Sequence, residues 1–476
     1  MAANASAPSS SSKTAHTTDT FRPLLKQLIL SQPLPIPNIS SSSSSTARPL
    51  APALSSSELD SLFDHLSDPA FTSNPAHHAQ LGACLTGLRL GGVDAQAETL
   101  AIASQRFLGK CIEVDSTDEE SWRLRREELQ RRLREEGGWE ESGLLSEAYK
   151  GTVDLVGTGG DGQDTFNVST TAAIVASGVP GVRVCKHGAK ASSSTSGSAD
   201  LLLSLGIPLL SLTPSIISTL LPTSSFVFLF AQLFHPALAP LGPIRRALGH
   251  PTIFNVLGPL INPARPARCI LGVHSPYLGE IFAEALKRRG CERAWIVCGK
   301  EGLDEISIEG ETDVWELDAG TIKHFVVSPL ESFGIPAHPL KSVASYTSAE
   351  NAAVVLHMVQ PGQEASVSAS TAPLSEPLAV QLASASAGDE VTRALLSGSQ
   401  SLPAIPAGAD IRALMDYTLL QASALLYVGG YAHSLKDAVA LARKSLNGGG
   451  ALRSLEAFRR EATKEVQMAA AAVNSA

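Results

Sequence analysis

The stretch from Asp154 to Asp200 constrains the fold of this chain more than any other part of the sequence. It reads DLVGTGGDGQDTFNVSTTAAIVASGVPGVRVCKHGAKASSSTSGSAD, in which two short apolar segments are each followed by small and hydroxyl-bearing residues. Four glycines fall within six residues of the first loop, at Gly157, Gly159, Gly160 and Gly162. Such a composition can hardly build a core, but it can present backbone N–H groups, hydroxyls and the ammonium of Lys186 to a polyanion.

The pattern from Thr152 onward alternates strands, loops and helices. It predicts apolar strands at 153–156, 182–185, 226–230, 269–273 and 294–298. It predicts helices at 170–177, 199–205, 236–248 and 277–289. Apolar strands that alternate with helices are typical of an α/β domain with a mostly parallel central sheet flanked by helices. Ligands of such sheets bind at the carboxyl ends of the strands, where the loops 157–162 and 186–198 are expected to lie.

The rest of the 476-residue chain divides by composition. Apolar residues at helical spacing predict a small all-helical domain before the sheet, and alternating charges predict a solvated helical insertion between the two. After a segment rich in Ala, Ser and Pro, three more helical patterns end the chain. We expect a disordered leader at 1–20, a helical domain at 21–111 with contributions from about 235–258, a charged insertion at 112–150, and an α/β domain at 151–476 with a low-complexity excursion at about 361–409.

The bulk composition argues against several classes of protein. A net charge of −9 disfavours a general nucleic-acid binder, which usually carries a basic excess. No apolar run is long enough to span a membrane. The six cysteines have no CxxC spacing, which favours reduced thiols and a cytoplasmic protein. The leader is rich in Ser, Ala and Thr, as organelle transit peptides are, but it lacks arginine, so a disordered tail is favoured.

The first loop satisfies the GxGxxG pattern of dinucleotide-binding folds. In those folds the helix opens at the glycines, whereas QDTFNVS intervenes here, and Lys186 and His187 stand where a ribose-binding acid is expected. The Rossmann interpretation is therefore rejected. A Walker loop is rejected because no Gly-Lys-Ser/Thr follows the glycines. Two interpretations remain: a phosphate cradle, or a strand-to-helix turn whose helix is capped near Asn167. In a phosphate cradle, Asp161 would repel the ligand unless a cation or a ribose hydroxyl lies between them.

Several motifs in a fixed order carry a resemblance to one family. GTGGDG, NVST and KHG…SGSAD are followed by FLFAQLFHPALAPLGPIRRALGHPTIFNVLGPLINPA from residue 228 and by EGLDEIS at 301–307. Together they closely resemble the anthranilate phosphoribosyltransferases, enzymes of the tryptophan pathway with the type III phosphoribosyltransferase fold. The resemblance covers most of the chain apart from the leader, the charged insertion and the excursion.

The resemblance implies transfer of the 5-phosphoribosyl group from phosphoribosyl pyrophosphate to anthranilate, giving N-(5-phosphoribosyl)anthranilate and pyrophosphate. This pentosyl transfer needs charge neutralisation on the leaving group and positioning of a weak amine, and it needs no protein nucleophile. Positioning is implied for Lys186 and Arg245. The family also implies Mg²⁺ as the cofactor and a homodimer through the N-terminal helices, and neither a nucleic acid nor a membrane is expected as a partner.

The family motifs imply three sets of site residues. The set for phosphoribosyl pyrophosphate comprises Gly157, Gly160, Asp161, Thr165, Asn167, Ser169, Thr170, Lys186, Ser193, Ser194 and Ser198. The set for anthranilate comprises Gly157, His187, Ala189, Arg245, Gly258 and Pro259. The set for magnesium comprises Ser169, Asp304 and Glu305. Hard oxygen ligands from a carboxylate pair suit Mg²⁺, although such a pair alone would also fit an acidic surface turn after a strand.

Two residues of the anthranilate set have a specific chemical expectation. A guanidinium matches a carboxylate in a bidentate fashion, so Arg245 is expected to meet the anthranilate carboxylate, while Arg246 is expected to be an exposed helix charge. The chain has KHGA where the family usually has KHGN, so Ala189 lacks the amide that commonly contacts anthranilate. Either the backbone carbonyl of Ala189 suffices, or a neighbour such as Asn255 compensates.

Two rival functions share this fold. Pyrimidine nucleoside phosphorylases usually show a KHSTGGVGD-like first loop, whereas this chain has LVGTGGDG without the preceding lysine. A non-catalytic, nucleic-acid-binding relative should carry a basic surface and damaged metal ligands, whereas this chain is acidic and keeps Asp304 and Glu305. The sequence therefore favours the transferase.

Overall fold

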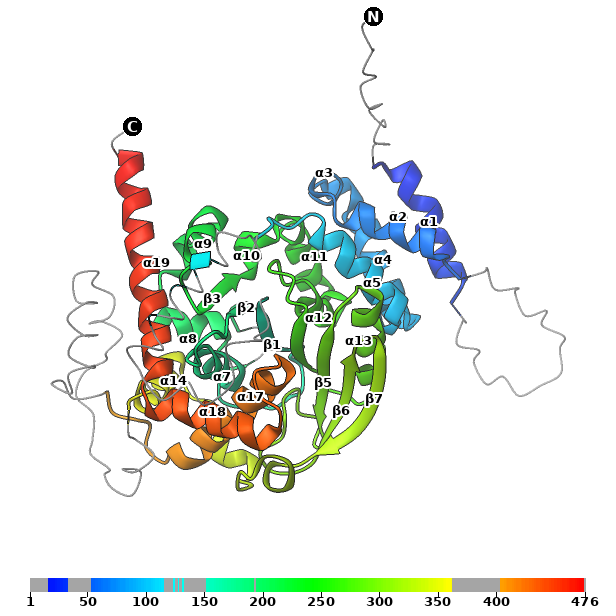
Figure 1. The fold of residues 1–476 in the computed structure, drawn as a ribbon. Helices are drawn as coiled ribbons and strands as arrows, with labels where there is room; N and C mark the ends of the chain where they lie inside the picture. Colours follow the sequence, from blue (N-terminus) through cyan, green and yellow to red (C-terminus); the bar gives the residue numbers. More distant parts are fainter. Residues whose placement is uncertain are drawn as a thin grey trace, which may run out of the picture. The chain divides into compact units, whose positions relative to one another are not determined.

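The computed structural model describes residues 16–32, 53–114, 151–191, 194–361 and 403–474, with four positions between 123 and 131. The first fifteen residues, most of the predicted insertion and most of the predicted excursion lie outside the described residues. Contacts divide the chain into two compact units (Figure 1). The first consists of residues 1–94 and 237–252, and the second of residues 95–236 and 253–476.

The first unit is built from amphipathic helices. Capping boxes begin α1 and α2, where Thr17 and Ser55 accept hydrogen bonds from backbone N–H groups that have no partner within the helix. One face of α1 buries Phe21, Leu24 and Leu28. The helices of this unit are α1 (Thr18–Leu30), α2 (Ser56–Leu66), α3 (Pro69–Thr72), α4 (His78–Leu90) and α11 (Leu241–Leu248), with a 3₁₀ turn η1 (Pro75–His77).

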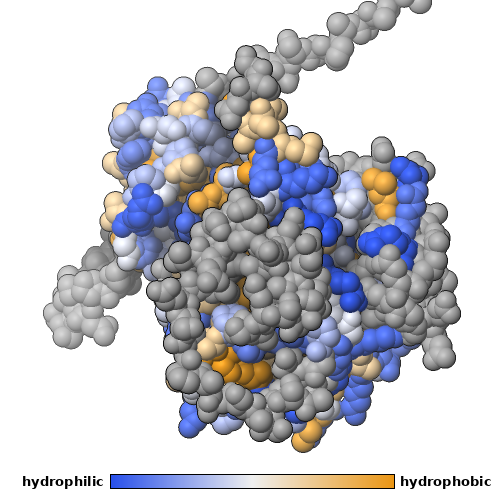
Figure 2. All heavy atoms as spheres, turned by 90° about the vertical axis from the view of Figure 1, so that its left-hand side faces the viewer, coloured by the Kyte–Doolittle hydropathy of each residue, from blue (hydrophilic) through white to orange (hydrophobic). Residues whose placement is uncertain are grey.

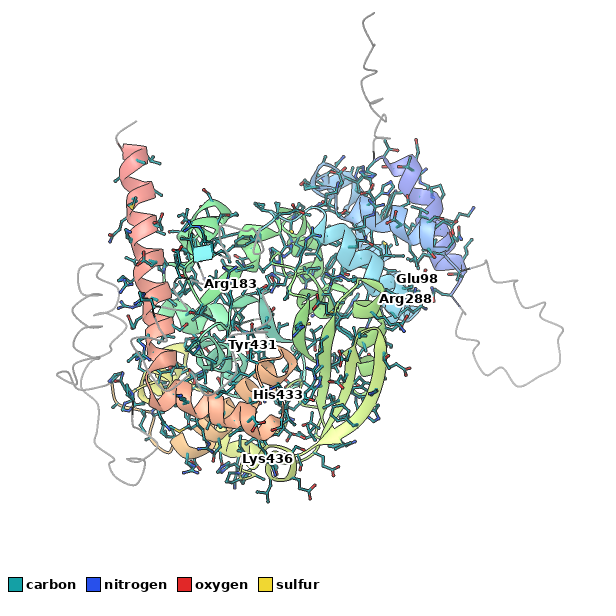
Figure 3. The ribbon with its side chains drawn as sticks, in the orientation of Figure 1. Glu98, Arg183, Arg288, Tyr431, His433 and Lys436 are labelled. Atoms are coloured by element: carbon teal, nitrogen blue, oxygen red, sulfur yellow. The ribbon has the colours of Figure 1, made fainter. Side chains whose placement is uncertain are left out.

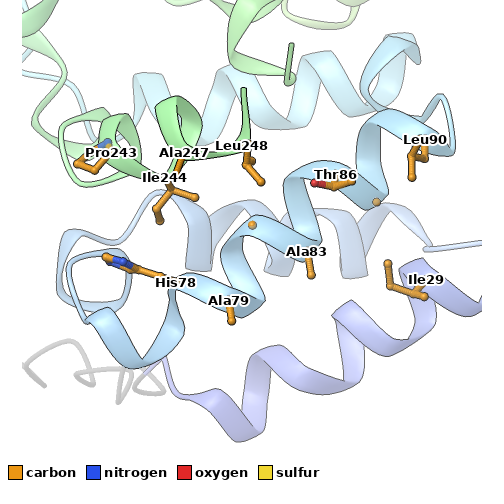
Figure 4. Close-up of a pocket in the computed structure, with 12 residues that line it drawn as sticks. Ile29, His78, Ala79, Ala83, Thr86, Leu90, Pro243, Ile244, Ala247 and Leu248 are labelled. Carbon is orange, nitrogen blue, oxygen red and sulfur yellow. The ribbon is translucent and has the colours of Figure 1, made fainter. Parts of the chain in front are cut away.

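An apolar groove of about 800 Å³ lies on the first unit between α1, α4 and α11 (Figure 4). Two large hydrophobic side chains at its rim reach solvent: Leu90 is 82% exposed and Ile29 is 45% exposed. The remaining lining residues are His78, Ala79, Gly82, Ala83, Thr86, Gly87, Pro243, Ile244, Ala247 and Leu248.

The second unit is built on a seven-stranded sheet in the order β3-β2-β1-β4-β5-β6-β7. Strands β1 to β5 run parallel, and β6 and β7 are antiparallel. The strands are β1 (Val153–Gly157), β2 (Val184–Gly188), β3 (Phe226–Phe230), β4 (Arg268–Gly272), β5 (Arg293–Gly299), β6 (Thr312–Asp318) and β7 (Thr321–Val327). The predicted mostly parallel sheet is confirmed. The strand order reverses between β1 and β4, which is where such sheets bind ligands.

The sequence prediction did not include β6 and β7. These strands bury only part of their residues, so they lack the continuous apolar runs that identify β1 to β5. They are joined by Ala319 and Gly320, whose φ angles of 45° and 79° are both positive. Two positive φ angles are the signature of a type I′ turn, which matches the twist of a hairpin.

The pairing between β1 and β2 is short. Val153 lies opposite Val184, and the ladder stops there. By contrast, β1 pairs with β4 as far as Gly157, and β2 pairs with β3 as far as Gly188. The two strands that lead into the polar loops are therefore each paired to an outer neighbour but hardly to each other.

Helices flank the sheet, as predicted. Helix α7 (Val168–Ser177) is buried at every position except Ser169 and packs against α17 (Ile411–Val428). The three helices expected at the end of the chain are found as α17, α18 and α19. The other α-helices of this unit are α5 (Ala97–Leu108), α8 (Ser198–Ser204), α9 (Pro214–Leu220), α10 (Ala231–Phe234), α12 (Phe254–Leu257), α13 (Tyr277–Arg288), α14 (Ser348–Met358), α18 (Leu435–Asn447) and α19 (Gly450–Asn474).

Three further details differ from the sequence prediction. Helix α1 begins at Thr18, within the leader that was expected to be disordered over residues 1–20. Helix α5 was expected in the helical domain, but it belongs to the second unit because it packs on α13. Glu98 on α5 and Arg288 on α13 are labelled in Figure 3. The single helix expected at 236–248 is a 3₁₀ turn, η5 (Pro236–Leu238), followed by α11. Pro240 separates the two because proline has no N–H to donate to the preceding turn.

The described part of the chain contains no helix that is both long enough and apolar enough to cross a membrane. The longest strongly apolar helix, α17, is instead buried in the core of the second unit. On the face drawn in Figure 2, hydrophilic side chains cover most of the coloured surface, and hydrophobic ones gather in small patches.

Candidate active site

Two loops of the second unit meet at the carboxyl ends of β1 and β4. The glycine loop follows β1, and the loop after β5 brings Asp304 and Glu305 back toward it. The contact is direct, because the N–H of Gly159 donates to Oδ2 of Asp304 at 2.6 Å. The N–H of Thr158 also donates to the carbonyl of Gly272 at the end of β4, at 2.9 Å. The site therefore lies at the point where the strand order reverses.

Glycines make this approach possible in two ways. Gly159, Gly160 and Gly162 have φ angles of 71°, 82° and 73°, in the left-handed region that other residues rarely adopt. At Gly157 the constraint is steric, because an added Cβ would collide with the carboxyl group of Asp304. An added Cβ at Gly272 would collide with the backbone carbonyl of Asp304. The ends of both strands must therefore be side-chain-free for the acidic loop to enter.

The two carboxylates are buried and repel each other. Asp304 is 8% exposed and Glu305 is 9% exposed. Burial, together with the nearby Asp161 carboxylate, raises the pKa of Asp304 to about 7. Burial and the charge of Asp304 also raise the pKa of Glu305 well above its usual value, although Lys186 acts in the opposite direction. The mutual repulsion of Asp161, Asp304 and Glu305 is an electrostatic cost that a nearby cation would reduce.

Lys186 lies beneath the acidic loop and is almost completely buried. Its ammonium donates to the carbonyl of Leu155 on β1 and, at 3.3 Å, to Oγ of Ser169 on α7. Burial lowers the pKa of Lys186, and the carboxylates of Asp154 and Glu305 oppose that change. The lysine thus connects β2, on which it lies, with β1 and the start of α7.

Hydrogen bonds join the two polar loops. The Asn167 amide donates to the Ser196 carbonyl at 2.7 Å, and the Ser196 hydroxyl donates to Oδ1 of Asn167 at 2.9 Å. The Thr195 N–H donates to Asp164 at 3.0 Å, and Asn351 also donates to Oδ1 of Asn167 at 2.9 Å. The loops after β1 and β2 are therefore one connected rim.

The alternative interpretation, a strand-to-helix turn capped near Asn167, is not supported by the hydrogen bonds of Asn167. The Asn167 side chain makes no capping bond to α7, because its oxygen and its amide are both used between the loops. Thr170, in the first turn of α7, is fully buried, and its hydroxyl has no hydrogen-bond partner among the described residues. The first turn of α7 thus lacks a side-chain cap within the described part of the chain.

Two buried histidines lie next to this rim. Nε2 of His187 is 3.2 Å from Nε2 of His235, and burial lowers the pKa of His187 well below its usual value and that of His235 to about 4. The His187 ring also interacts with the backbone of Gly258. Both rings are therefore neutral near pH 7, so one Nε2 donates its hydrogen and the other accepts it. The sequence analysis included His187 but missed His235.

A buried glutamine holds the acidic loop in place. Nε2 of Gln421 on α17 donates to the Ile306 carbonyl at 2.6 Å, and the Ile306 N–H donates back to Gln421 at 3.4 Å. Sequence reasoning missed Gln421, because nothing in the apolar pattern of α17 marks one of its polar residues as different from the others. Asp154, Asn262 and Asn351 were also missed, because nothing in the sequence around each of them marks it as a site residue.

Comparisons with known proteins agree with this geometry. Residues 149–396 match the family described as "Glycosyl transferase family, a/b domain". The chain is 43% identical over 306 residues to the anthranilate phosphoribosyltransferase of Schizosaccharomyces pombe, which is 64% of this chain and 73% of the relative. The chain belongs to the anthranilate phosphoribosyltransferase family. The family's enzyme from Saccharomyces cerevisiae is 35% identical over 389 residues, covering 80% of this chain and 85% of that enzyme.

Solved structures of the same family have the same fold. The S. cerevisiae anthranilate phosphoribosyltransferase in complex with PRPP and Mg has a TM-score of 0.68 at 29% identity, and the match covers 94% of this chain and 99% of that one. The same enzyme in complex with 4-fluoroanthranilate has a TM-score of 0.66 at 28% identity, with the same coverage.

The remaining predicted residues are distributed as follows. Thr165 forms an isolated bridge with Ala344, Ser194 is exposed, and Ser198 begins α8. Gly258 and Pro259 form the start of the 3₁₀ turn η6 (Gly258–Leu260), and Ser193 lies outside the described residues. Arg245 and Arg246 belong to α11 in the first unit, where Arg245 is partly buried and Arg246 is exposed. The second unit thus brings together the glycine loop, Ser169, Lys186, Asp304 and Glu305.

Proposed function

We propose that this chain transfers the 5-phosphoribosyl group of phosphoribosyl pyrophosphate to anthranilate, in tryptophan biosynthesis. The observation that carries the proposal is the hydrogen bond between the Gly159 N–H and Asp304. It places a side-chain-free phosphate loop and a buried acidic pair at the same point. Neither feature alone is specific, but a diphosphate and its cation need both.

The donor is proposed to bind along the joined rim of the two loops. Glycines allow the backbone to approach phosphate oxygens, and the uncapped first turn of α7 offers N–H groups to an anion. Lys186 supplies the buried positive charge nearest to these loops. The residues proposed to take part are Gly157, Gly160, Asp161, Thr165, Asn167, Ser169, Thr170, Lys186, Ser193, Ser194 and Ser198.

Magnesium is proposed as the cofactor, and the residues present fit it. Asp304, Glu305 and the Ser169 hydroxyl are hard oxygen donors, and Glu305 also hydrogen-bonds with Ser169. Among the described residues, no group of three or more His, Cys, Asp or Glu side chains is arranged so that it could hold a metal ion, so the protein would supply fewer than three such ligands. An incomplete protein set suits Mg²⁺, which usually keeps positions for water and substrate phosphates. When bound, the ion would neutralise charge on the departing pyrophosphate.

The transfer itself needs no protein nucleophile. The lone pair of the anthranilate amine forms the new bond to C1 of the ribose, the bond from C1 to the pyrophosphate oxygen breaks with its electron pair, and the amine loses one proton. The chain's own residues hold the two partners in line, which supplies on the order of 7–11 kcal/mol in ideal cases. Lys186 and the glycine loop position the diphosphate side.

Anthranilate is proposed to contact Gly157, His187, Ala189, Arg245, Gly258 and Pro259. The neutral His187 offers an apolar ring face, since its pKa is lowered well below its usual value. The Ala189 carbonyl already accepts a hydrogen bond from the Ala199 N–H at 3.2 Å. A carbonyl oxygen has two lone pairs, so it keeps one acceptor position for the anthranilate amine.

The Arg245→Ala variant should weaken binding of the acceptor selectively. A charge-assisted hydrogen bond to a carboxylate is typically worth about 1.5–3 kcal/mol, so the KM for anthranilate should rise about ten- to hundred-fold. The KM for phosphoribosyl pyrophosphate should change much less. The matched control is Arg246→Ala on the exposed side of α11. Equal KM values for anthranilate in both variants and the wild type would contradict the role of Arg245.

Magnesium binding should depend on pH because the cation needs ionised carboxylates. The folded-state pKa of Asp304 is about 7, so affinity for Mg²⁺ should increase from about pH 6 to 8, with release of protons. The ordinary value is 3.8, so the folded, metal-free protein keeps a proton that the unfolded chain loses. Its stability should therefore fall as pH rises from about 4 to 7, and Mg²⁺ should restore it. Calorimetric titration and thermal unfolding would measure both effects; a pH-independent affinity would contradict them.

We also propose a homodimer through the helices of the first unit. The exposed Leu90 and Ile29 beside the apolar groove support it, because a second copy would remove these side chains from water. Light scattering after gel filtration should give twice the mass of one 49.7 kDa chain. Ala83→Arg in the groove should give single chains. A single-chain mass for the wild-type protein at micromolar concentration would contradict the proposal.

The direct test of the proposed function is the loss of anthranilate fluorescence when purified protein, Mg²⁺ and phosphoribosyl pyrophosphate are mixed. Omission of either the donor or the ion should prevent the loss. A parallel DNA gel-shift separates the transferase from a nucleic-acid-binding relative. Phosphorolysis of pyrimidine nucleosides without any anthranilate turnover would favour the phosphorylase instead.

A further inference from the structure

The sheet contains a fork between β2 and β1, the second and third strands counted from the β3 edge. From Asp154 to Gly157 on β1, and from Cys185 to Gly188 on β2, no backbone pair joins the two strands, although both segments stay paired to their outer neighbours. We call this region the β1–β2 fork. The glycine loop and the second polar loop begin at its two ends.

Side chains take over the hydrogen bonds that a closed ladder would make. Nδ2 of Asn262 donates to Oδ2 of Asp154 at 2.7 Å and to the Cys185 carbonyl at 2.8 Å. Oδ1 of Asp154 accepts from the Leu155 N–H at 2.8 Å, and the Lys186 ammonium donates to the Leu155 carbonyl. Backbone groups inside a protein must be paired, and here Asp154, Lys186 and Asn262 pair them.

The three side chains are as deeply buried as any in the core. Asp154 is 1% exposed, Lys186 is 1% exposed and Asn262 is 4% exposed. Burying a carboxylate, an ammonium and an amide costs free energy that a continued backbone ladder would not, so stability alone does not account for the fork. Because the ladder stops, the Leu155 carbonyl is free to accept a hydrogen bond from the Lys186 ammonium. The same ammonium also reaches Ser169 at the start of α7.

Asn262 is fixed independently of the fork. Its Oδ1 accepts a hydrogen bond from the Ala264 N–H at 2.9 Å, which orients the amide so that both Nδ2 hydrogens point at the two strands. Asp154 and Asn262 are separated by 108 residues in the sequence, and neither belongs to the three sets of site residues. The fold alone therefore brings these two side chains together, next to the Leu155 carbonyl that Lys186 binds.

We propose that Asp154 and Asn262 are positioning residues for the diphosphate of the donor. They hold β1 and β2 apart at the fork, so that Lys186 and the first loop are already placed when phosphoribosyl pyrophosphate arrives. They act through Lys186 and touch neither substrate. This inference rests on the proposed transferase function. It adds that Asp154 and Asn262 contribute to the affinity for phosphoribosyl pyrophosphate.

The test compares Asp154→Asn, Asn262→Asp and the double exchange by steady-state kinetics. Each single variant keeps the shape of the side chain but leaves two like groups facing each other, so the KM for phosphoribosyl pyrophosphate should rise at least about tenfold, as for other supporting residues. The KM for anthranilate should stay within about twofold of the wild type. The double exchange restores one amide–carboxylate hydrogen bond, so its donor KM should be lower than the product of the two single effects predicts.

The matched control is Asp416→Asn, which changes an equally buried carboxylate on α17 that binds His338 at 2.9 Å and Arg412 at 3.1 Å. It should lower the melting temperature without changing the donor KM. Fork variants that behave like this control, or that raise both KM values equally, overturn the inference. If one single variant does not fold, the double exchange is compared with the other: a donor KM no higher than that of the remaining single variant supports positioning, and a higher donor KM overturns it. A wild-type protein without transfer activity would overturn the proposed function itself.

Discussion

Replacing Glu305 by glutamine should reduce turnover at least about a hundredfold while the protein stays folded, as expected when a preorganised charge is removed from a reacting site. Glutamine keeps the size of the side chain, so the buried site stays filled. It removes the negative charge that, with Asp304, is proposed to hold Mg²⁺. The rate should be measured over a range of Mg²⁺ concentrations, because a lost ligand shifts that dependence to higher concentration, and circular dichroism should confirm folding.

Glu311→Gln is the matched control for this variant, since Glu311 lies on the same loop but is exposed. It should leave both the rate and its magnesium dependence unchanged. A Glu305→Gln enzyme with normal turnover at limiting Mg²⁺ would show that the acidic pair is an ordinary buried turn.

Gly157→Ala should be nearly as damaging, although it adds only one methyl group. The new Cβ would collide with the Asp304 carboxyl group, so either the end of β1 or the acidic loop must move. Because a displacement of about 1 Å can cost about a hundredfold in rate, a loss of this order is expected. Affinity for Mg²⁺, measured by calorimetry, should fall together with turnover, since the methyl group acts on a proposed metal ligand.

Gly310→Ala is the control for backbone effects. A Cβ at Gly310 meets no atom within 4 Å, and its φ is not in the left-handed region, so the substitution should be neutral. If Gly157→Ala were also neutral, the acidic loop could be displaced without loss of function, and the proposed geometry of the site would be wrong.

Much of the fold was predictable because its signals are local. The five parallel strands are short and mostly apolar, and a helix follows each of β1 to β4 before the next strand, so strand type and sheet type follow from the pattern. The hairpin of β6 and β7 was missed because its strands are partly exposed and alternate in polarity. Likewise, α5 has the pattern of any amphipathic helix, and only its partner, α13, reveals the unit to which it belongs.

The site was predictable to the extent that its residues lie in short motifs. The glycine loop, Lys186 and the Asp304–Glu305 pair are recognisable because each motif has a composition that a core cannot use. Asn262, Gln421 and Asp154 are different, since each has a partner more than a hundred residues away and no local spacing marks them. The side chain of Asn167 illustrates the same limit: its place in the sequence suggests a cap, and only the fold brings Ser196 to it.

The burial of α7 determines which parts of the site can adapt. Every residue of this helix except Ser169 is enclosed by core side chains, so its first turn cannot shift without opening the core. The end that is proposed to face the phosphates is thus a fixed part of the site. Any adjustment during substrate binding and product release is therefore expected in the loops after β1 and β2. Because hydrogen bonds join these two loops, they are expected to move together.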